Sequence, residues 1–492
     1  MTWNAGANSC SHISQLLESG DCTLLQLIKE ENIKVALKRQ IPKLIDFLIE
    51  HVDQLTDIAL GVIHTDFPPA QSICFSLILT QMHSLTSKLI ENKVLLGCLN
   101  RFISNEKPLT PSGAAAFARI VQYLIQASAV KILEIFPERE QFFARVLRHI
   151  SHIAITNLLD FMTDNGHKNM LTFLEDNKAT DTLLGLISDD ESINEKVFLF
   201  LTNIIASVEI DSPLLIPFED TKTMETIFNK IMTTPNPHVA SKALNLIYEL
   251  TGQCESDEEE STNTDPLYHS VFRFTVNKIP EICDFITSPK PFLVDKASAV
   301  ELVNILIASN IKIDQCVIDL TETLFNQIFE FPAHTILQRS FLTLFSSILK
   351  NDKNICANLI KKANMKQRII QAYEKRYQIN ASYWGILFTL STKLIESFPN
   401  EAGSAISSPA DQAWAHFAAN VIVAIKDTIT NEYGGELPDE NADNSDSEDL
   451  EFPLGRSQLA RQASVVTKAP SKLRQVEEED YAEEDDDDDK KK

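Results

Sequence analysis

The sequence predicts an all-α protein built from many stacked amphipathic helices, and three features of the chain indicate this fold. Glycine supplies only 13 of the 492 residues, against a usual share of about 7%, so the glycine-dependent turns of β-rich folds are scarce. Apolar side chains recur at a helical period through most of the chain. Short polar or proline-containing breaks separate these apolar stretches, and strand-like alternation is nearly absent.

The clearest predicted helix begins after residue 110. Thr110 is a suitable N-cap, and Pro111 suits the first helical position because a backbone N–H would have no partner there. One apolar stripe follows at spacings of three and four residues, formed by Phe117, Ile120, Val121, Leu124 and Ile125. Such a stripe predicts a helix with one face against a neighbouring helix.

The same period occurs in two later stretches of the chain. Between residues 193 and 205, the apolar positions are Ile193, Val197, Phe198, Leu201, Ile204 and Ile205. Between residues 337 and 348, they are Leu337, Phe341, Leu344, Phe345 and Ile348. Pro332 is predicted to open the second of these helices, because proline is favoured in the first helical turn.

Short breaks between the apolar stretches can each turn the chain into an antiparallel helix. Examples are Asn165-Gly166, Asp189-Asp190, Pro235-Asn236-Pro237 and Ser397-Phe398-Pro399. About ten helix pairs of ~40 residues fit between residues 9 and 433, and this repeat length is typical of HEAT and armadillo arrays. The sequence therefore predicts a HEAT/armadillo-like α-solenoid over residues 1–433, a curved surface that suits extended protein partners.

Two charged segments depart from this pattern. The segment from about 254 to 266 contains an acidic run, Glu255 to Ser261, and is predicted to be a solvated loop between helices. Residues 434–492 carry 19 acidic and 8 basic side chains and few large apolar ones. We expect this acidic C-terminal tail to be disordered, because it lacks the apolar surface needed to form a core.

Composition excludes several classes of protein. The formal charge of −25 has the wrong sign for binding nucleic acid or an anionic membrane surface. No stretch is long and apolar enough for a transmembrane helix, and the first residues lack the pattern of a signal peptide. The eight cysteines form no C-x-x-C pair. We therefore expect reduced thiols and a cytoplasmic location, with the nucleus as a further expectation.

No residue pattern predicts catalysis. The chain contains no G-x-G pair, no phosphate-binding loop and no G-x-S-x-G elbow. His149 and His152 are three residues apart on a predicted helix, but a metal site needs three or four ligands. Cysteines in apolar helical stretches are expected to act as small hydrophobes: Cys98, Cys283, Cys316 and Cys356. We predict no catalytic residue, cofactor or metal, and therefore no enzyme.

Three serines of the tail are candidate phosphorylation sites. Ser464 follows Arg461 at the spacing that basophilic kinases favour, while Ser445 and Ser447 lie among acidic residues that suit acidophilic kinases. Phosphate there would add to a field of like charge. The alternative is that these serines are exposed and have no regulatory use.

The first 190 residues carry a family resemblance. The N-terminal elements are Trp3, Ser11-His12-Ile13, Leu16-Leu17-Glu18, Thr23-Leu24, Leu27, Glu30-Glu31 and Lys43-Leu44-Ile45-Asp46-Phe47-Leu48. The later elements are Pro108-Leu109, Leu147, His149-Ile150, Ala154-Ile155, Leu158-Leu159, Leu174-Glu175, Lys178, Leu183-Leu184 and Leu186-Ile187. Together they resemble the SAPS family, the regulatory subunits of protein phosphatase 6. The chain departs from the family pattern at Thr2 and at Ser151-His152.

The resemblance implies a regulatory and scaffolding subunit that binds the catalytic subunit of a protein phosphatase 6-like Ser/Thr phosphatase and directs it to substrates. It also leaves open a third, ankyrin-repeat subunit. The candidate partner-binding residues are Trp3, Leu16, Leu17, Thr23, Leu24, Lys43, Asp46 and His149. Trp3 can instead pack on the first helices, while Phe47 and Leu48 are expected in the core. The alternative function for the same fold is an importin-like transport adaptor.

Overall fold

The computed structural model describes residues 5–136, 138–164, 168–253, 267–398 and 409–430, and within these ranges every regular element is a helix. The first half of the chain contains α1 (Ala5–Glu18), α2 (Leu24–Ile28), α3 (Ile33–Lys38), α4 (Pro42–Glu50), α5 (Val52–Ala59), α6 (Ala70–Ile78), α7 (His83–Ile90), α8 (Lys93–Ile103), α9 (Pro111–Ile135), α10 (Arg139–Leu147), α11 (Ile153–Asp164), α12 (Lys168–Asp176), α13 (Ala179–Leu184), α14 (Glu191–Ser207), η1 (Pro213–Glu219), α15 (Thr221–Thr233) and α16 (Pro237–Gln253). The second half contains η2 (Tyr268–Arg273), α17 (Phe274–Asn277), α18 (Ile279–Thr287), α19 (Val294–Ala308), α20 (Gln315–Glu330), α21 (Thr335–Asn351), α22 (Lys353–Lys362), α23 (Met365–Glu374), α24 (Trp384–Ser397), α25 (Pro409–Phe417), η4 (Ala418–Ile422) and α26 (Val423–Thr430). The predicted all-α fold class is confirmed.

The predicted start of α9 is also confirmed. Thr110 is its N-cap and accepts a hydrogen bond from the backbone N–H of Gly113 at 3.2 Å, while Pro111 occupies the first helical position. The apolar stripe of this helix is buried: Phe117, Ile120, Val121, Leu124 and Ile125. The helix bends at Ser128, whose φ of −167° and ψ of 87° are not helical.

The prediction that Pro332 opens α21 is wrong. The helix begins at Thr335, and His334 caps it by accepting a hydrogen bond from the backbone N–H of Leu337 at 3.3 Å. Pro332 remains in the preceding turn, where its carbonyl oxygen accepts a 2.9 Å bond from the backbone N–H of Ser382. The proline is thus part of the contact between two repeats rather than of the helix.

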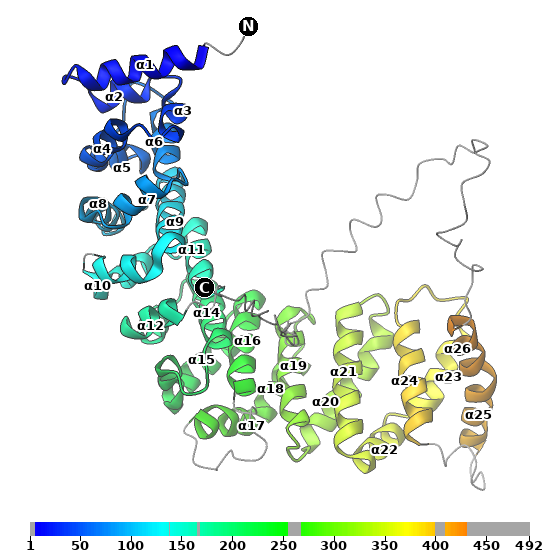
Figure 1. Ribbon diagram of the computed structural model, residues 1–492. Coiled ribbons are helices and arrows are strands. Elements are labelled where there is room, and N and C mark those ends of the chain that lie inside the picture. The colour runs from blue at the N-terminus through cyan, green and yellow to red at the C-terminus, as the bar shows by residue number, and fades with distance from the viewer. Residues whose placement is uncertain (1–4, 137, 165–167, 254–266, 399–408, 431–492) are drawn as a thin grey trace, which may run out of the picture. The chain divides into compact units, whose positions relative to one another are not determined.

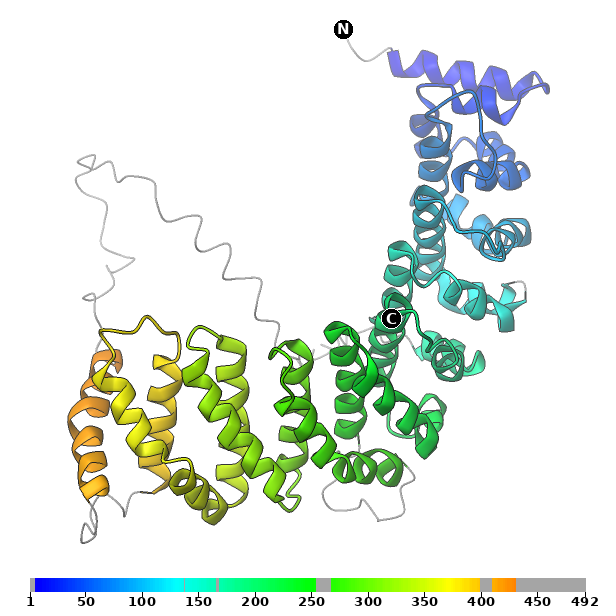
Figure 2. The ribbon, with the colours of Figure 1, turned by 180° about the vertical axis from the view of Figure 1, so that it is seen from behind.

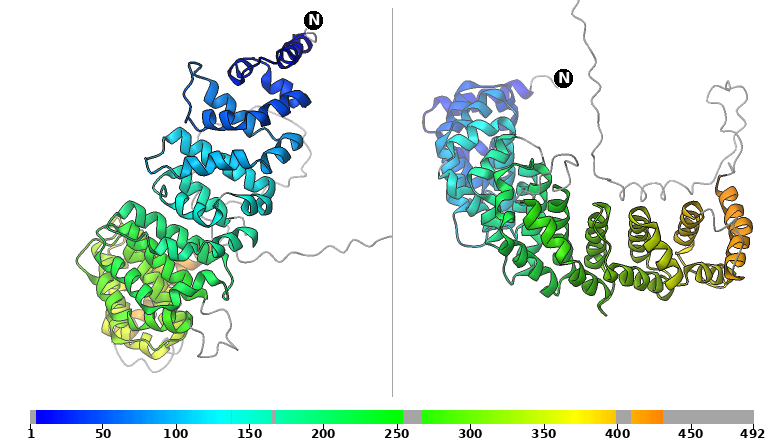
Figure 3. Two further views of the ribbon diagram at one scale, coloured as in Figure 1. Left: turned by 90° about the vertical axis from the view of Figure 1, so that its left-hand side faces the viewer. Right: turned by 90° about the horizontal axis from the view of Figure 1, so that it is seen from below.

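The helices stack as successive neighbours within the unit Met1–Ile425. In one layer α9 packs against α11, α11 against α14, α14 against α16, α16 against α19, α19 against α21 and α21 against α24. In the other layer α8 contacts α10, α10 contacts α13, and α18 contacts α20. Helices α16, α19 and α21 stand side by side in Figures 1 and 2, and Figure 3 gives two further views.

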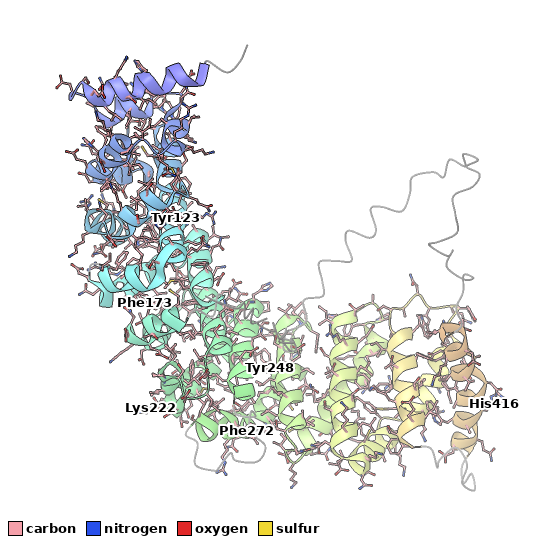
Figure 4. The ribbon with its side chains drawn as sticks, viewed as in Figure 1. Tyr123, Phe173, Lys222, Tyr248, Phe272 and His416 are labelled. Carbon is pink, nitrogen blue, oxygen red and sulfur yellow. The ribbon has the colours of Figure 1, made fainter. Side chains whose placement is uncertain are left out.

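Polar contacts between neighbouring helix pairs recur at a nearly constant separation in sequence. Tyr123, labelled on α9 in Figure 4, donates to the Thr80 carbonyl 43 residues away. Seven further hydrogen bonds join residues that are 42 to 46 positions apart: Lys88–Asp46, Arg101–Asp57, His149–Ile103, Asn203–Asp160, Thr234–Glu191, Ser347–Asn304 and Lys362–Asp319. The bonds therefore repeat with the helix pair, which confirms an α-solenoid with a repeat near the predicted length.

One repeat is longer than the others. Ser241 and Ser298 share a hydrogen bond of 2.8 Å between α16 and α19, although they are 57 residues apart. The acidic segment 254–266 lies between them in sequence, and its length accounts for the excess over the usual period. This segment and the predicted tail, 434–492, lie outside the described residues, as do the breaks at Asn165-Gly166 and Pro399.

Buried thiols lie within the helical layers. Cys98 and Cys283 are each 3% exposed and Cys356 is fully buried, which agrees with the expected role of small hydrophobes, while Cys316 is half-buried. Burial raises the pKa of Cys356 to about 12, so its thiol stays protonated. Among the described helices, none combines the length and the apolar composition that crossing a bilayer requires.

Candidate functional site

A surface hollow lies where Pro108 and His149, which belong to two of the later elements of the family resemblance, come together. The turn after α8 contributes Asn105, Glu106 and Pro108, and the turn after α10 contributes Arg148, His149 and Ser151. The hollow has a volume of about 420 Å³. Both turns precede helices of the same layer, α9 and α11, so they are adjacent although they are more than 40 residues apart in sequence.

His149 joins these two turns. Its Nε2 atom lies 3.3 Å from the carbonyl oxygen of Ile103 at the end of α8, and the residue is only 8% exposed. Burial lowers the pKa of His149, partly opposed by hydrogen bonds to the backbone of Ile103 and Asn105. The neutral imidazole is therefore favoured, and it donates to a carbonyl rather than carrying a charge toward a ligand.

The histidine pair does not lie on one helix, contrary to the sequence prediction. α10 ends at Leu147 and α11 begins at Ile153, so His149 and His152 both lie in the turn between them. In the part of the chain that the structure describes, no group of three or more His, Cys, Asp or Glu side chains is placed to hold a metal ion.

The rim of the hollow is exposed and chemically mixed. Glu106 and Arg148 are exposed and supply opposite charges. Ile153, the first residue of α11, lies two residues after the lining residue Ser151 and is 72% exposed. The hollow and the adjoining start of α11 thus offer charged groups and an apolar side chain to a protein partner.

Several N-terminal residues proposed as partner contacts have structural roles. Leu24 is 1% exposed and belongs to the core, while Leu16 and Leu17 are half-buried. Thr23 caps α2: its hydroxyl oxygen accepts from the backbone N–H of Gln26, whose side chain in turn accepts from the Thr23 N–H at 2.9 Å. This capping box fixes the start of α2. A partner role for these residues stays a prediction.

Lys43 and Asp46 do form a surface feature. They are exposed and three residues apart on α4, so they share one face of that helix. Lys43 pairs with Glu18 of α1 at 3.0 Å, and Asp46 pairs with Lys88 of α7 at 2.5 Å. We call Glu18, Lys43, Asp46 and Lys88 the charged row. Exposed ion pairs contribute at most about 1 kcal/mol to stability. A partner protein can therefore replace these pairs at little cost in stability.

The remaining predicted site residues lie outside the described residues: Trp3, Ser445, Ser447 and Ser464. Conversely, the sequence analysis missed Arg148 and Ile153. The sequence did carry a signal for Ile153, because this residue lies outside the helical period set by Ile155, Leu158, Leu159 and Met162.

Comparison with known proteins identifies several relatives, and regulatory subunits of protein phosphatase 6 are among them. Serine/threonine-protein phosphatase 6 regulatory subunit 3-B of Xenopus laevis is 25% identical over 326 residues, which cover 60% of this chain and 38% of that protein. Regulatory subunit 3 of the same phosphatase from Gallus gallus is 28% identical over 207 residues, covering 40% of this chain and 22% of that protein. Extragenic suppressor of kinetochore protein 1 of Schizosaccharomyces pombe is 24% identical over 330 residues, with coverages of 58% and 39%.

The chain therefore spans about two fifths or less of the length of these relatives. No family model matches it. A crystal structure of SYS-1 aligns with 83% of this chain and 86% of that chain at 10% identity, with a TM-score of 0.33, which is too low to bear on the fold. The resemblance inferred from the N-terminal residues is confirmed by the curated relatives.

Proposed function

We propose that this chain, a relative of the SAPS-type regulatory subunits of protein phosphatase 6, is a non-catalytic regulatory subunit that binds a protein phosphatase 6-like catalytic subunit and directs it to substrates. The single observation that carries the proposal is the similarity over 326 residues to a protein named as such a regulatory subunit. In this proposal the active centre and its metals belong to the catalytic partner.

The helical array supports this role on physical grounds. Stacked repeats expose a long surface, and such surfaces suit protein partners. The hollow at residues 105–108 and 148–151 and the charged row both lie in the part of the chain that carries the sequence resemblance. We propose that these two surfaces contribute to the contact with the catalytic subunit, and that an ankyrin-repeat protein joins as a third subunit in the cytoplasm.

Co-purification with the catalytic subunit of protein phosphatase 6 tests the proposal. The full chain should recover the phosphatase, and a variant with Arg148→Glu and Ile153→Ser should recover about tenfold less, because the surface at the hollow and the start of α11 would reverse a charge and lose an apolar contact. Charge reversal at Lys43→Glu and Asp46→Lys tests the charged row in the same way.

Lys353→Glu is a matched control, because this lysine is also exposed but lies on α22, far along the chain from both surfaces. Circular dichroism of each variant separates loss of binding from loss of folding. Failure of the unmodified chain to recover any phosphatase contradicts the proposed function. Recovery by the unmodified chain and all variants alike contradicts only the assignment of these two surfaces.

A further inference from the structure

Three consecutive loops form one continuous surface at the starts of α19, α21 and α24. We call residues 288–293, 330–336 and 375–383 the loop edge. The Nε2 atom of His334 lies 2.8 Å from the carbonyl oxygen of Phe292, which joins the first loop to the second. The carbonyl oxygen of Pro332 accepts bonds of 2.9 Å from both the backbone N–H and the hydroxyl of Ser382, which joins the second loop to the third. The loops are therefore held in fixed order.

The loop edge exposes large apolar side chains. Phe331 is 52% exposed, Ile336 is 47% exposed and Leu293 of the preceding loop is 46% exposed. Phe331 and Ile336 line a hollow of about 570 Å³ whose other lining residues lie in the same turn. Tyr377 of the third loop is 97% exposed. Clustered apolar exposure of this kind is typical of a protein interaction site.

Basic side chains lie on the two loops that adjoin the loop of the hollow. Lys290 is exposed on the first loop, and Lys375 and Arg376 are exposed on the third. Glu330, which lines the hollow, interacts electrostatically with Arg368 of α23. The whole chain carries a net charge of −25, whereas the two loops on either side of the hollow in the chain carry these three exposed basic side chains.

We propose that the loop edge binds an extended acidic segment of a partner protein, with one bulky apolar side chain of that segment in the hollow beside Phe331. Packed helices lie about 8–10 Å apart, and an extended chain advances about 3.3 Å per residue. The flanking lysines and arginine therefore match acidic residues about three positions on either side of the apolar anchor. This proposal goes beyond phosphatase binding and does not depend on it.

A labelled synthetic peptide tests the proposal by fluorescence anisotropy with the full chain. The probe has nine residues, with phenylalanine at the centre, aspartate three positions to each side, and serine or alanine elsewhere. We expect saturable binding with a Kd of about 10–100 µM, typical of a short single-anchor contact. Raising the salt concentration should weaken it, because both flanks contribute Coulombic attraction.

Phe331→Ala should weaken binding about tenfold by removing the apolar contact. Lys375→Glu combined with Arg376→Glu should weaken it by a similar factor through charge reversal. The matched controls are Val94→Ser and Lys93→Glu on α8, where both residues are exposed and far along the chain from the loop edge. These controls should leave the affinity unchanged.

Four results would overturn the proposal. They are no saturation up to about 1 mM peptide, equal binding of a peptide with lysine in place of aspartate, equal binding of a sequence-scrambled peptide, and equal loss of binding in the controls. Sedimentation of the unmodified chain and of Phe331→Ala distinguishes a second copy as the occupant. A dimer that dissociates on substitution would mean that the loop edge is a self-association surface instead.

Discussion

The Nζ atom of Lys296 donates a hydrogen bond of 2.6 Å to the carbonyl oxygen of Ser288, although the lysine is only 2% exposed. A second bond of 2.8 Å reaches the carbonyl oxygen of Lys290. One buried ammonium group thus holds the turn that follows α18 against the first turn of α19. Buried charges persist only when they are hydrogen-bonded in this way.

We predict that Lys296→Met lowers the free energy of unfolding by about 2 kcal/mol, because two carbonyl groups lose their donor in a buried position. Urea denaturation monitored by circular dichroism measures the change. Lys290→Met is the matched control, since that side chain is exposed in the same turn and its loss should alter stability by less than about 0.5 kcal/mol. Equal effects of the two substitutions would contradict a stabilising role for the two buried hydrogen bonds of Lys296.

A second prediction concerns the pH dependence of stability through His149. Its pKa is lowered in the folded chain chiefly by burial, so between the ordinary value near 6.5 and the lowered value the unfolded state binds more protons than the folded state. The contribution of His149 is therefore fully present above pH 6.5 and is lost as the pH falls through that window. Denaturation at pH 7.5 and at pH 5 should show a larger loss for the unmodified chain than for His149→Gln.

Glutamine at this position retains a side-chain N–H that can reach the Ile103 carbonyl but does not titrate. His416, which lies on α25 at a distance along the chain, supplies the control as His416→Gln. An identical pH profile for the unmodified chain and His149→Gln would contradict a buried, neutral imidazole at residue 149.

The helical period was sufficient to predict the stacking of helices. The apolar stripe from Phe117 to Ile125 is buried as expected, because a stripe at spacings of three and four has only one face to place against a neighbour. Helix starts were less predictable when a tertiary contact decided them. Pro332 is an example, since its carbonyl oxygen accepts a hydrogen bond from Ser382 in the next repeat. Residues near Pro332 in the sequence do not reveal this distant donor.

The candidate site was predictable only in part, for a related reason. Family resemblance drew attention to His149 and Lys43, but sequence spacing does not distinguish a residue that faces the core from one that faces solvent in a short turn. His149 proved to be an internal donor, whereas Lys43 is exposed and paired with Glu18. The loop edge was missed because its members are separated by one full repeat in the sequence.

A third prediction concerns thiol reactivity. Burial raises the pKa of Cys74 and of Cys356 to about 12, so neither forms a thiolate at neutral pH, and both are fully buried. Mass spectrometry after brief treatment of the folded chain with iodoacetamide should show little modification at these two residues. The half-buried Cys316 should react faster, and all three should react at similar rates in urea. Rapid labelling of Cys356 in the folded chain would contradict the packing of α22.

A fourth prediction follows from the long repeat between α16 and α19. Because the hydrogen bond between Ser241 and Ser298 joins neighbouring helices as in the other repeats, we predict that this repeat folds without the 13 residues from 254 to 266. Replacing them with a short Gly-Ser linker should change the free energy of unfolding by less than about 1 kcal/mol, since loop closure depends only weakly on loop length.

The control for this deletion removes a segment of similar length that forms a helix, Met365–Glu374, and should abolish cooperative unfolding because α23 contributes buried side chains to the core. Binding of the catalytic subunit of protein phosphatase 6 by the linker variant provides a second readout. Loss of cooperative unfolding in the linker variant would mean that residues 254–266 are part of the repeat core rather than an insertion into it.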